Sequence, residues 1–233
     1  MKNYKKIRYK SRKEWLLHRG LGGSSAYVVC YADTPNLTRL NIFNQLVKHE
    51  AKKEKDNSLM AHGRRLEPII RDFYLANNSN IKLLDYSPYD IYYKNQYLTA
   101  SLDGLIKDTS TNQLGILEIK TRLCRNISEI EKWKNGDIPF NYLLQIVHYF
   151  NIIDNAYFCD FVACFSLQNE TFEIIKYRFF RNDLKATIKA LDKTENDFID
   201  NYIIKQETPP LDLFNERGKA FVSLINEYHG CKK

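Results

Sequence analysis

The spacing of apolar residues along the chain changes several times, and each change predicts a new element of secondary structure. A helix is predicted over residues 64–77, because five apolar side chains recur there at helical intervals: Leu66, Ile69, Ile70, Phe73 and Tyr74. Pro68 lies within this pattern, so it must open the helix or kink it. Residues 14–19 also have helical character, and the turn over residues 20–25 is expected to lead into another helix.

After residue 80 the pattern becomes that of β-strands, which are expected over residues 81–84, 91–100, 104–107 and 115–121. Two helices should follow, near residues 128–134 and 139–153, and then a hairpin of two strands over residues 157–167 and 171–179. This order of elements predicts an α/β fold of the α+β kind, in which a mixed sheet is flanked by helices.

The C-terminal quarter of the chain reads as helical. Asn182 or Asp183 can cap a long helix that extends to about Ile204. Pro209 and Pro210 separate this helix from a final amphipathic helix, so residues 206–233 are expected to form a C-terminal helical extension.

The composition favours one compact domain. The chain has 233 residues, of which 44% are hydrophobic and 13% aromatic, with only 9 Gly and 6 Pro. This length is long for one domain and short for two, so a single domain over residues 1–233 is expected.

Positive charge is concentrated at the N-terminus. The formal net charge is +7, and no acidic residue precedes Glu14, although seven Lys and Arg residues do. Residues 1–13 are therefore expected to form a basic arm that suits the phosphate backbone of a nucleic acid. The alternative is a solvated tail that serves solubility only.

Two further patterns restrict the protein class. No run of apolar residues reaches the ~18 that a membrane helix requires, and the N-terminus lacks the apolar segment of a secretory signal. We therefore expect a soluble intracellular protein without a membrane partner. The five scattered cysteines include no CxxC pair, which predicts reduced thiols rather than a zinc site or disulfides.

The strongest chemical signal lies between residues 101 and 121. Ser101-Leu102-Asp103-Gly104-Leu105 ends one predicted strand, and Glu118 and Lys120 lie on the next, where alternation places both on one face. If Asp103 faces them, two carboxylates converge on a hard cation such as Mg²⁺. Lys120 could then orient or deprotonate a nucleophilic water during phosphodiester hydrolysis. The alternative is a surface hairpin with a Glu/Lys pair and an Asp-Gly turn.

Five motifs occur in a characteristic order: Trp15-Leu16-Leu17-His18-Arg19 with Gly22-Gly23-Ser24-Ser25, Gly63-Arg64-Arg65-Leu66-Glu67, Ser101-Leu102-Asp103-Gly104, Glu118-Ile119-Lys120, and Gln145-Ile146-Val147-His148-Tyr149. This order resembles the PD-(D/E)xK nuclease superfamily, which has a restriction-endonuclease-like core. Within it, the chain most resembles the YqaJ-like viral recombinase and phage lambda exonuclease family, from about Trp15 to Phe165.

The resemblance implies roles for individual residues of the catalytic centre. Asp103 and Glu118 match the metal ligands, with the carbonyl oxygen of Ile119 as a third, and Lys120 matches the catalytic lysine. Glu67 matches an acid near one or two metal ions, although a salt bridge to Arg71 is the alternative. Gln145 matches the residue that positions the lysine, and Tyr149 completes the pattern as a supporting residue.

The resemblance also implies a site for a terminal 5′-phosphate, formed by Arg19, Ser24, Ser25 and Ser101. The alternative for the serines is a glycine turn with a serine helix cap. The chain departs from the family pattern at Leu102, where Pro is usual, and at Ser25, where many relatives carry an acid. His62 could be a further metal ligand, which the lambda-like enzymes do without.

By resemblance, the protein would be a deoxyribonuclease that uses Mg²⁺, with Mn²⁺ as a substitute. It would act 5′ to 3′ on ends of double-stranded DNA during viral or phage recombination, in the cytoplasm of the host cell. By the same resemblance, it would work with a single-strand annealing protein and would form a homo-oligomeric ring, a trimer in the family. The alternatives are a restriction-like or structure-specific endonuclease of the same fold and a non-catalytic nucleic-acid-binding module.

Overall fold

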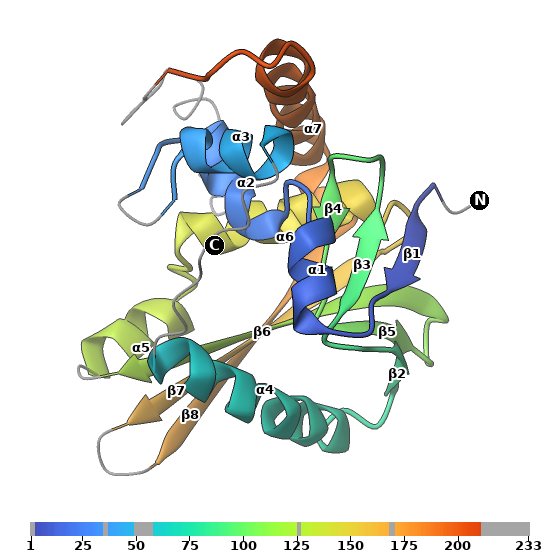
Figure 1. Cartoon of the computed structure of the whole chain (residues 1–233). Coiled ribbons are helices and arrows are strands. Elements are labelled where there is room, and N and C mark those ends of the chain that lie inside the picture. Colours follow the sequence, from blue (N-terminus) through green and yellow to red (C-terminus); the bar gives the residue numbers. More distant parts are fainter. Residues whose placement is uncertain (1–2, 35–36, 49–57, 125–126, 168–170, 211–233) are drawn as a thin grey trace.

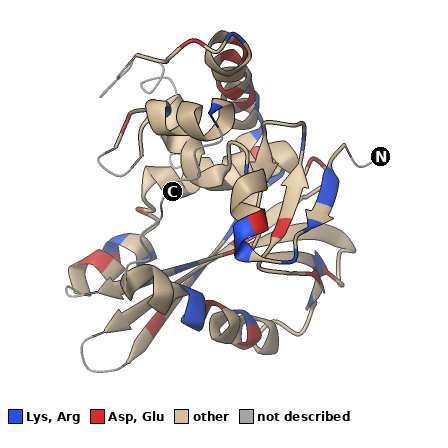
Figure 2. Ribbon diagram, viewed as in Figure 1, with Lys and Arg blue, Asp and Glu red and all other residues tan. Residues whose placement is uncertain are grey.

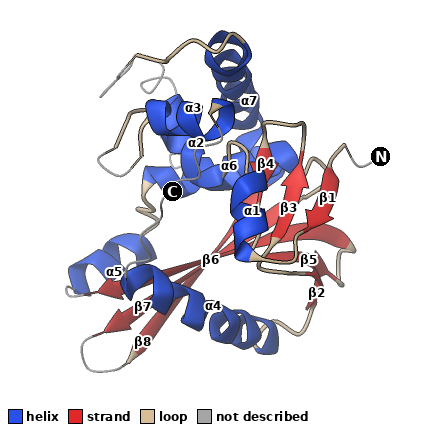
Figure 3. Ribbon diagram, viewed as in Figure 1, coloured by secondary structure: helices blue, strands red, loops and turns tan. Residues whose placement is uncertain are grey.

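The computed structural model describes residues 3–34, 37–48, 58–124, 127–167 and 171–210. A five-stranded mixed sheet lies at the centre of this part of the chain. Helices cover both of its faces, and a three-stranded sheet lies beside it (Figure 1, Figure 3). The predicted α/β fold with a mixed sheet flanked by helices is therefore confirmed.

The large sheet has the order β2-β5-β6-β7-β8. Its strands are β2 (Ile81–Asp85), β5 (Gly104–Asp108), β6 (Gln113–Cys124), β7 (Phe158–Leu167) and β8 (Phe172–Phe180). Strands β6 and β7 run parallel, whereas every other neighbouring pair in this sheet is antiparallel. The parallel pair requires a crossover, which helices α5 (Ile127–Lys134) and α6 (Phe140–Ile152) supply.

Helix α4 (Ser58–Ala76) covers one face of the large sheet. Ile70 and Tyr74 are buried against a cluster that includes Leu117 and Ile119 of β6. The helix and β6 approach closely at Gly63, where a Cβ atom would lie 2.8 Å from Thr121 Oγ1. A side chain at residue 63 would therefore push the helix away from the strand.

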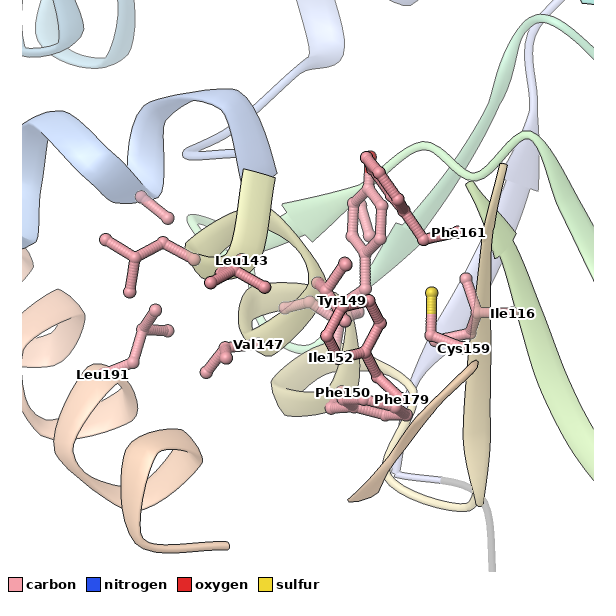
Figure 4. Close-up of a cluster of buried hydrophobic side chains, with 14 of the residues drawn as sticks. Ile116, Leu143, Val147, Tyr149, Phe150, Ile152, Cys159, Phe161, Phe179 and Leu191 are labelled. Atoms are coloured by element: carbon pink, nitrogen blue, oxygen red, sulfur yellow. The ribbon is translucent and has the colours of Figure 1, made fainter. Parts of the chain in front are cut away.

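The opposite face of the large sheet packs against α6. Figure 4 shows Phe150 of α6 beside Phe161 and Phe179 of the sheet, within a cluster of buried apolar side chains. Helices α2 (Gly23–Cys30) and α7 (Lys185–Phe198) pack on the outer side of α6, and α3 (Arg39–Val47) contacts α2. The alternation along β6 thus separates two cores, with Leu117 and Ile119 toward α4 and Ile116 toward α6.

The small sheet consists of β1 (Lys5–Arg8), β3 (Asp90–Tyr93) and β4 (Thr99–Ala100). Part of the expected basic arm is therefore a folded strand, which pairs with β3. Lys6 forms ion pairs with Asp85 and with Asp90, the latter at 2.7 Å, and Arg8 pairs with the same two carboxylates. Although β1 is coloured as basic in Figure 2, these acids neutralise two of its three cationic residues, Lys6 and Arg8.

Four corrections concern individual elements. Helix α4 begins at Ser58 rather than near residue 64, and Pro68 lies inside it, so of the two roles expected for Pro68 only the kink remains open. Ile69 and Phe73 are 62% and 52% exposed, because α4 contacts the sheet only through the side that carries Ile70 and Tyr74.

The single strand expected over residues 91–100 is divided into two strands, β3 and β4. Asn95 lies between them, where its side-chain oxygen accepts hydrogen bonds from the backbone amides of Tyr97 and Leu98.

The fourth correction concerns Asn182 and Asp183, which lie in a 3₁₀ turn (Arg181–Leu184), whereas α7 begins without a side-chain cap. The long helix ends in a π-helical turn (Ile199–Ile204). Most of the expected C-terminal extension, including its final helix, lies outside the described residues. Cys30, Cys124, Cys159 and Cys164 are buried and form no disulfide among the described residues, and none of the described helices has the length and apolar content of a membrane span.

A buried polar network attaches α6 to α7 and β4. His148 Nδ1 lies 2.6 Å from Glu195 Oε1, and its Nε2 lies 2.8 Å from the Thr99 carbonyl oxygen. Because both partners are acceptors, both ring nitrogens donate, and the imidazole is positively charged. Burial by itself would lower the pKa of His148, but the Glu195 carboxylate and the Thr99 carbonyl raise it above its usual value. Lys94 and Asp192, which pair at 2.7 Å, border this network.

We expect His148→Gln to lower the free energy of unfolding by about 2 kcal/mol near pH 6, because charged hydrogen bonds to Glu195 and Thr99 are lost. A group with a raised folded pKa stabilises the protein fully below its unfolded value of 6.5, and this contribution disappears as the pH rises through the folded pKa. The difference between wild type and variant should therefore shrink toward high pH, as measured by urea denaturation from pH 6 to 10. A difference that stays constant over this range would show that His148 is neutral in the folded protein.

Candidate active site

The candidate site lies where β5 begins, opposite the middle of β6, beside α4 and α6. Asp103 immediately precedes β5, and its Oδ2 accepts a 2.7 Å hydrogen bond from the Ile119 backbone amide. Glu118 and Lys120 share one face of β6, as alternation predicts, and Lys120 Nζ lies 2.5 Å from Glu118 Oε1. The structure thus brings Asp103, Glu118 and Lys120 together.

Glu67 reaches the same place from α4. Its Oε1 accepts hydrogen bonds from an Arg71 guanidinium nitrogen at 2.9 Å and from the Tyr86 hydroxyl at 3.1 Å. The salt bridge considered as the alternative role for Glu67 is therefore present. Arg71 also donates through Nε to the Asp103 carbonyl oxygen at 2.8 Å, so it joins Glu67 to the Asp103 loop.

The carboxyl groups of the site raise one another's pKa. Burial and the negative charge of Glu118 raise the pKa of Asp103 to about 7. Burial and the charge of Asp103 raise the pKa of Glu67 to about 7. Burial raises the pKa of Glu118 as well, although the adjacent Lys120 opposes this shift. The site therefore holds more negative charge than its surroundings compensate, which is the electrostatic condition for binding a cation.

Lys120 supplies the positive charge that lies nearest to Glu118. Burial would lower the pKa of Lys120, but Glu118 and Asp103 raise it above its usual value, so the side chain is an ammonium ion. Its Nζ also lies 5.2 Å from the centre of the Tyr142 ring, where a cation is attracted to the face of the ring.

Helix α6 fixes the orientation of the Glu118 carboxylate. Gln145 Nε2 donates to Glu118 Oε1 at 2.7 Å and to the Tyr149 hydroxyl oxygen at 2.6 Å. Gly23, in the first turn of α2, packs directly on this pair, since a Cβ atom there would lie 2.7 Å from Gln145 Cγ. The glycine turn near the N-terminus and the QxxxY motif on α6 therefore form one packed unit.

The residues fit a divalent cation of the hard type. Glu118 is 2% exposed, and its Oε2 is buried without a hydrogen-bond partner, so an acceptor is available at the centre of the site. Asp103, Glu118 and the Ile119 carbonyl oxygen would hold the ion, and Mg²⁺ accepts such a small set because it keeps several waters. Among the described residues, no three His, Cys, Asp or Glu side chains form a ready-made metal cluster.

The residues expected to bind a 5′-phosphate lie beside this centre. Arg19, Ser24 and Ser25 line one small cavity, and the Arg19 guanidinium carbon lies 4.4 Å from the centre of the Trp15 ring. Trp15 Nε1 donates to Ser101 Oγ at 3.1 Å, which connects this cavity to the Asp103 loop. The alternative role of the serines as helix caps does not apply, because Gly22 occupies the N-cap position of α2 and no side chain caps it.

Two residues of the site carried no recognisable signal in the sequence. The sequence suggests Arg71 only as a salt-bridge partner of Glu67. In the structure Arg71 also donates to the Asp103 carbonyl oxygen, and its guanidinium carbon lies 3.4 Å from the centre of the Tyr86 ring. Tyr86 follows β2, and its contact with Glu67 depends on how α4 crosses the sheet edge. Pattern and spacing contain no information about such a contact.

The chain is similar in sequence to a known family and to a known protein. A family model described as the YqaJ-like viral recombinase domain matches residues 6–155. The uncharacterized protein YqaJ of Bacillus subtilis (strain 168) is 25% identical over 212 residues, which cover 87% of this chain. The chain spans only 60% of the length of that relative.

Solved structures share the fold. The alkaline exonuclease LHK-Exo from Laribacter hongkongensis superposes with a TM-score of 0.53 at 21% identity, and the match covers 83% of this chain and 97% of that one. The crystal structure of LHK-Exo in complex with dAMP gives a TM-score of 0.51 with the same identity and coverage. The expected PD-(D/E)xK type of core is therefore confirmed as a fold.

Proposed function

The chain belongs to the YqaJ-like viral recombinase family, and from this premise we propose that it is a metal-dependent deoxyribonuclease that degrades double-stranded DNA from its 5′ ends. The observation that carries the proposal is the convergence of Asp103, Glu118 and Lys120 around the buried, unpartnered Oε2 of Glu118. The name of LHK-Exo, an alkaline exonuclease whose structure contains dAMP, supports the same class of substrate.

Each side chain of the site would have a separate role in phosphodiester hydrolysis. Mg²⁺ or Mn²⁺, as one or two ions, would polarise the scissile phosphate and lower the pKa of a bound water. Asp103 and Glu118 would hold the ion, and Gln145 keeps the Glu118 carboxylate in one orientation. Lys120, an ammonium ion at this position, would offset the negative charge that develops on the phosphate and orient the attacking water.

Arg19 would select the 5′ end. A guanidinium group can bind a terminal phosphate through two hydrogen bonds, and the hydroxyls of Ser24, Ser25 and Ser101 can add donors. Because Trp15 stacks on Arg19 and donates to Ser101, the phosphate site and the metal site would keep a fixed separation. This separation would place the first phosphodiester bond of the strand at the catalytic centre.

The proposal is tested with linear duplexes that carry 5′-phosphate or 5′-hydroxyl ends and with a closed circular duplex. We expect mononucleotide release from the phosphorylated linear duplex with Mg²⁺, no cleavage of the circle, and no activity in EDTA. Cleavage of the circle would instead support an endonuclease of the same fold. Unchanged DNA binding without cleavage under any condition would support a binding module.

Arg19→Ala is expected to reduce the preference for a 5′-phosphate by about 10- to 100-fold, since it removes charged hydrogen bonds worth roughly 1.5–3 kcal/mol. Lys13→Ala, which removes an exposed charge from the same helix α1 (Arg12–His18), is the matched control and should leave the preference unchanged. Competition between the two duplex ends in one reaction measures the preference. An equal loss of activity on both kinds of end would show that Arg19 supports folding or the metal site and does not recognise the 5′-phosphate.

On the same premise we propose that the exposed 3′-strand is delivered to a single-strand annealing protein and that the active species is a ring-shaped oligomer. Light scattering of the full chain tests the oligomer, and pull-down of a purified annealing protein tests the partner.

A further inference from the structure

A large cavity among the described residues lies outside the metal site. Its volume is about 860 Å³, within the range of roughly 300–1,000 Å³ that is typical of ligand sites. The walls are strand β1, the turn between β3 and β4, the end of α1 and the end of α3. Of the residues that line it, the proposed reaction uses only Arg19.

Aromatic rings form much of the wall. Tyr4, Tyr9, Tyr93 and Tyr97 all line the cavity, each of them partly exposed. Tyr9 is held in place, because its ring stacks on His18 with centroids 4.5 Å apart and its hydroxyl lies 2.7 Å from that of Tyr93. The Tyr93 hydroxyl in turn donates to the His18 carbonyl oxygen at 3.1 Å. These rings are therefore preorganised rather than mobile.

The charge of the cavity is of one sign. Its lining includes Lys5, Arg19 and Lys94 but no Asp or Glu. Lys94 is neutralised by Asp192, which lies outside the lining. Alternation along β1 explains the asymmetry, because Lys5, Ile7 and Tyr9 line the cavity while Lys6 and Arg8 pair with acids on the opposite face. Cationic groups among aromatic rings are the combination that binds a nucleic-acid strand without base pairing.

The cavity continues from the expected phosphate site. Arg19 and Gly20 line both the large cavity and the small one that contains Ser24 and Ser25, and Gln45 lies on both as well. Gln45 Nε2 donates to the Arg19 carbonyl oxygen at 3.1 Å, which fixes this boundary. A strand that places an internal phosphate at Arg19, in place of its terminal 5′-phosphate, can therefore extend its 5′ end into the cavity.

We propose that this cavity binds a short unpaired stretch of single-stranded DNA at the duplex end, with bases stacked on the tyrosines and phosphates near Lys5 and Arg19. The position of the duplex end rests on the proposed function, but binding to the cavity does not require hydrolysis. The protein would therefore accept 5′ ends that carry unpaired nucleotides. An internal phosphate of such an overhang would lie at Arg19 in place of the terminal 5′-phosphate, and the cavity would hold the unpaired nucleotides on its 5′ side.

The test is fluorescence anisotropy of a labelled oligothymidylate with the full chain in EDTA. Tyr97→Ala should weaken binding by about 5- to 150-fold, the loss that removal of one base stack implies, whereas Tyr97→Phe keeps the ring and should retain the affinity. Tyr157→Ala, at an exposed tyrosine that does not line the cavity, is the matched control. Tyr97→Ala that binds as tightly as wild type would overturn the proposal.

A second variant covers the case in which Tyr97→Ala does not fold. Lys5 is exposed on β1, and Lys5→Ala should reduce the slope of log affinity against log salt by about 0.7, which corresponds to one phosphate contact on a single strand. An unchanged slope would count against the cavity. Hydrolysis of a blunt linear duplex with Mg²⁺ is measured separately with wild-type protein. If the variants lose oligonucleotide binding but the wild-type protein does not hydrolyse the duplex, the nuclease assignment alone is contradicted. If the wild-type protein hydrolyses the duplex but the variants bind the oligonucleotide as tightly as wild type, the cavity proposal alone is contradicted.

Discussion

Replacing Lys120 with methionine is expected to lower the rate of duplex hydrolysis by about 10²- to 10⁴-fold, the usual range for removing a proton-transferring or charge-stabilising group. Methionine keeps an unbranched apolar stem against Tyr142 but removes the ammonium group that lies 2.5 Å from Glu118 Oε1. Binding of the duplex should fall far less than turnover, because the loss concerns the transition state. Single-turnover hydrolysis of a 5′-phosphorylated duplex at saturating Mg²⁺ measures the effect.

The control is Lys132→Met, which makes the same change at an exposed position of α5 and should leave the rate unchanged. Because Lys120 compensates the buried charge of Glu118, the melting temperature of Lys120→Met must be measured together with its rate. A folded Lys120→Met variant that retains its rate within about tenfold would remove Lys120 from the mechanism.

The parts of the site that could be predicted from sequence are those that depend on local periodicity. Glu118 and Lys120 had to share a face of any regular strand, and an antiparallel neighbour that begins at Gly104 had to place Asp103 near them. Gln145 and Tyr149 are four residues apart on a helix, so they lie on one side of it and bind each other. Each of these relations is fixed by the geometry of a single element or of one hairpin.

The parts that could not be predicted depend on how separate elements meet. Arg71 contacts Asp103 and Tyr86 because α4 crosses the edge of the sheet there, and helical periodicity does not specify that crossing. The same limit explains Ile69 and Phe73, which are apolar at helical spacing but are exposed within the part of the chain that the structure describes. Charge counts fail in the same way, since Lys6 and Arg8 count as basic in the sequence but are neutralised by Asp85 and Asp90, which lie far away along the chain.

The second large effect is expected for Asp103→Asn, which should make the metal-free protein more stable and nearly inactive. Burial and the charge of Glu118 raise the pKa of Asp103 to about 7, so the ionised carboxylate destabilises the metal-free fold. Asparagine carries no charge, and its side-chain oxygen can still accept the hydrogen bond from the Ile119 amide. Loss of a metal ligand removes several kcal/mol of transition-state stabilisation, which corresponds to a rate about a thousandfold lower or more.

The size of this stability difference depends on pH, and the pH range over which it appears identifies the Asp103 carboxylate as its cause. Well below the unfolded pKa of 3.8, Asp103 is protonated in both the folded and the unfolded protein, so wild type and Asp103→Asn should melt at the same temperature in EDTA. As the pH rises from the unfolded value of 3.8 to about 7, the wild type alone loses stability, and the difference then stays constant. At pH 8 the variant should melt higher by about 2–4 °C for each kcal/mol relieved.

Magnesium should reverse this order, because an ion held by Asp103 and Glu118 stabilises the folded wild type by mass action and cannot stabilise the variant equally. Asp72→Asn, the same change at an exposed position of α4, should follow wild type under every condition. Calorimetric scans with EDTA and with Mg²⁺, at a pH well below 3.8 and at pH 8, therefore separate electrostatic strain from a general effect of the substitution. An Asp103→Asn protein that melts lower than wild type in EDTA at pH 8, or that gains as much from Mg²⁺, would show that Asp103 is a structural residue and not a ligand.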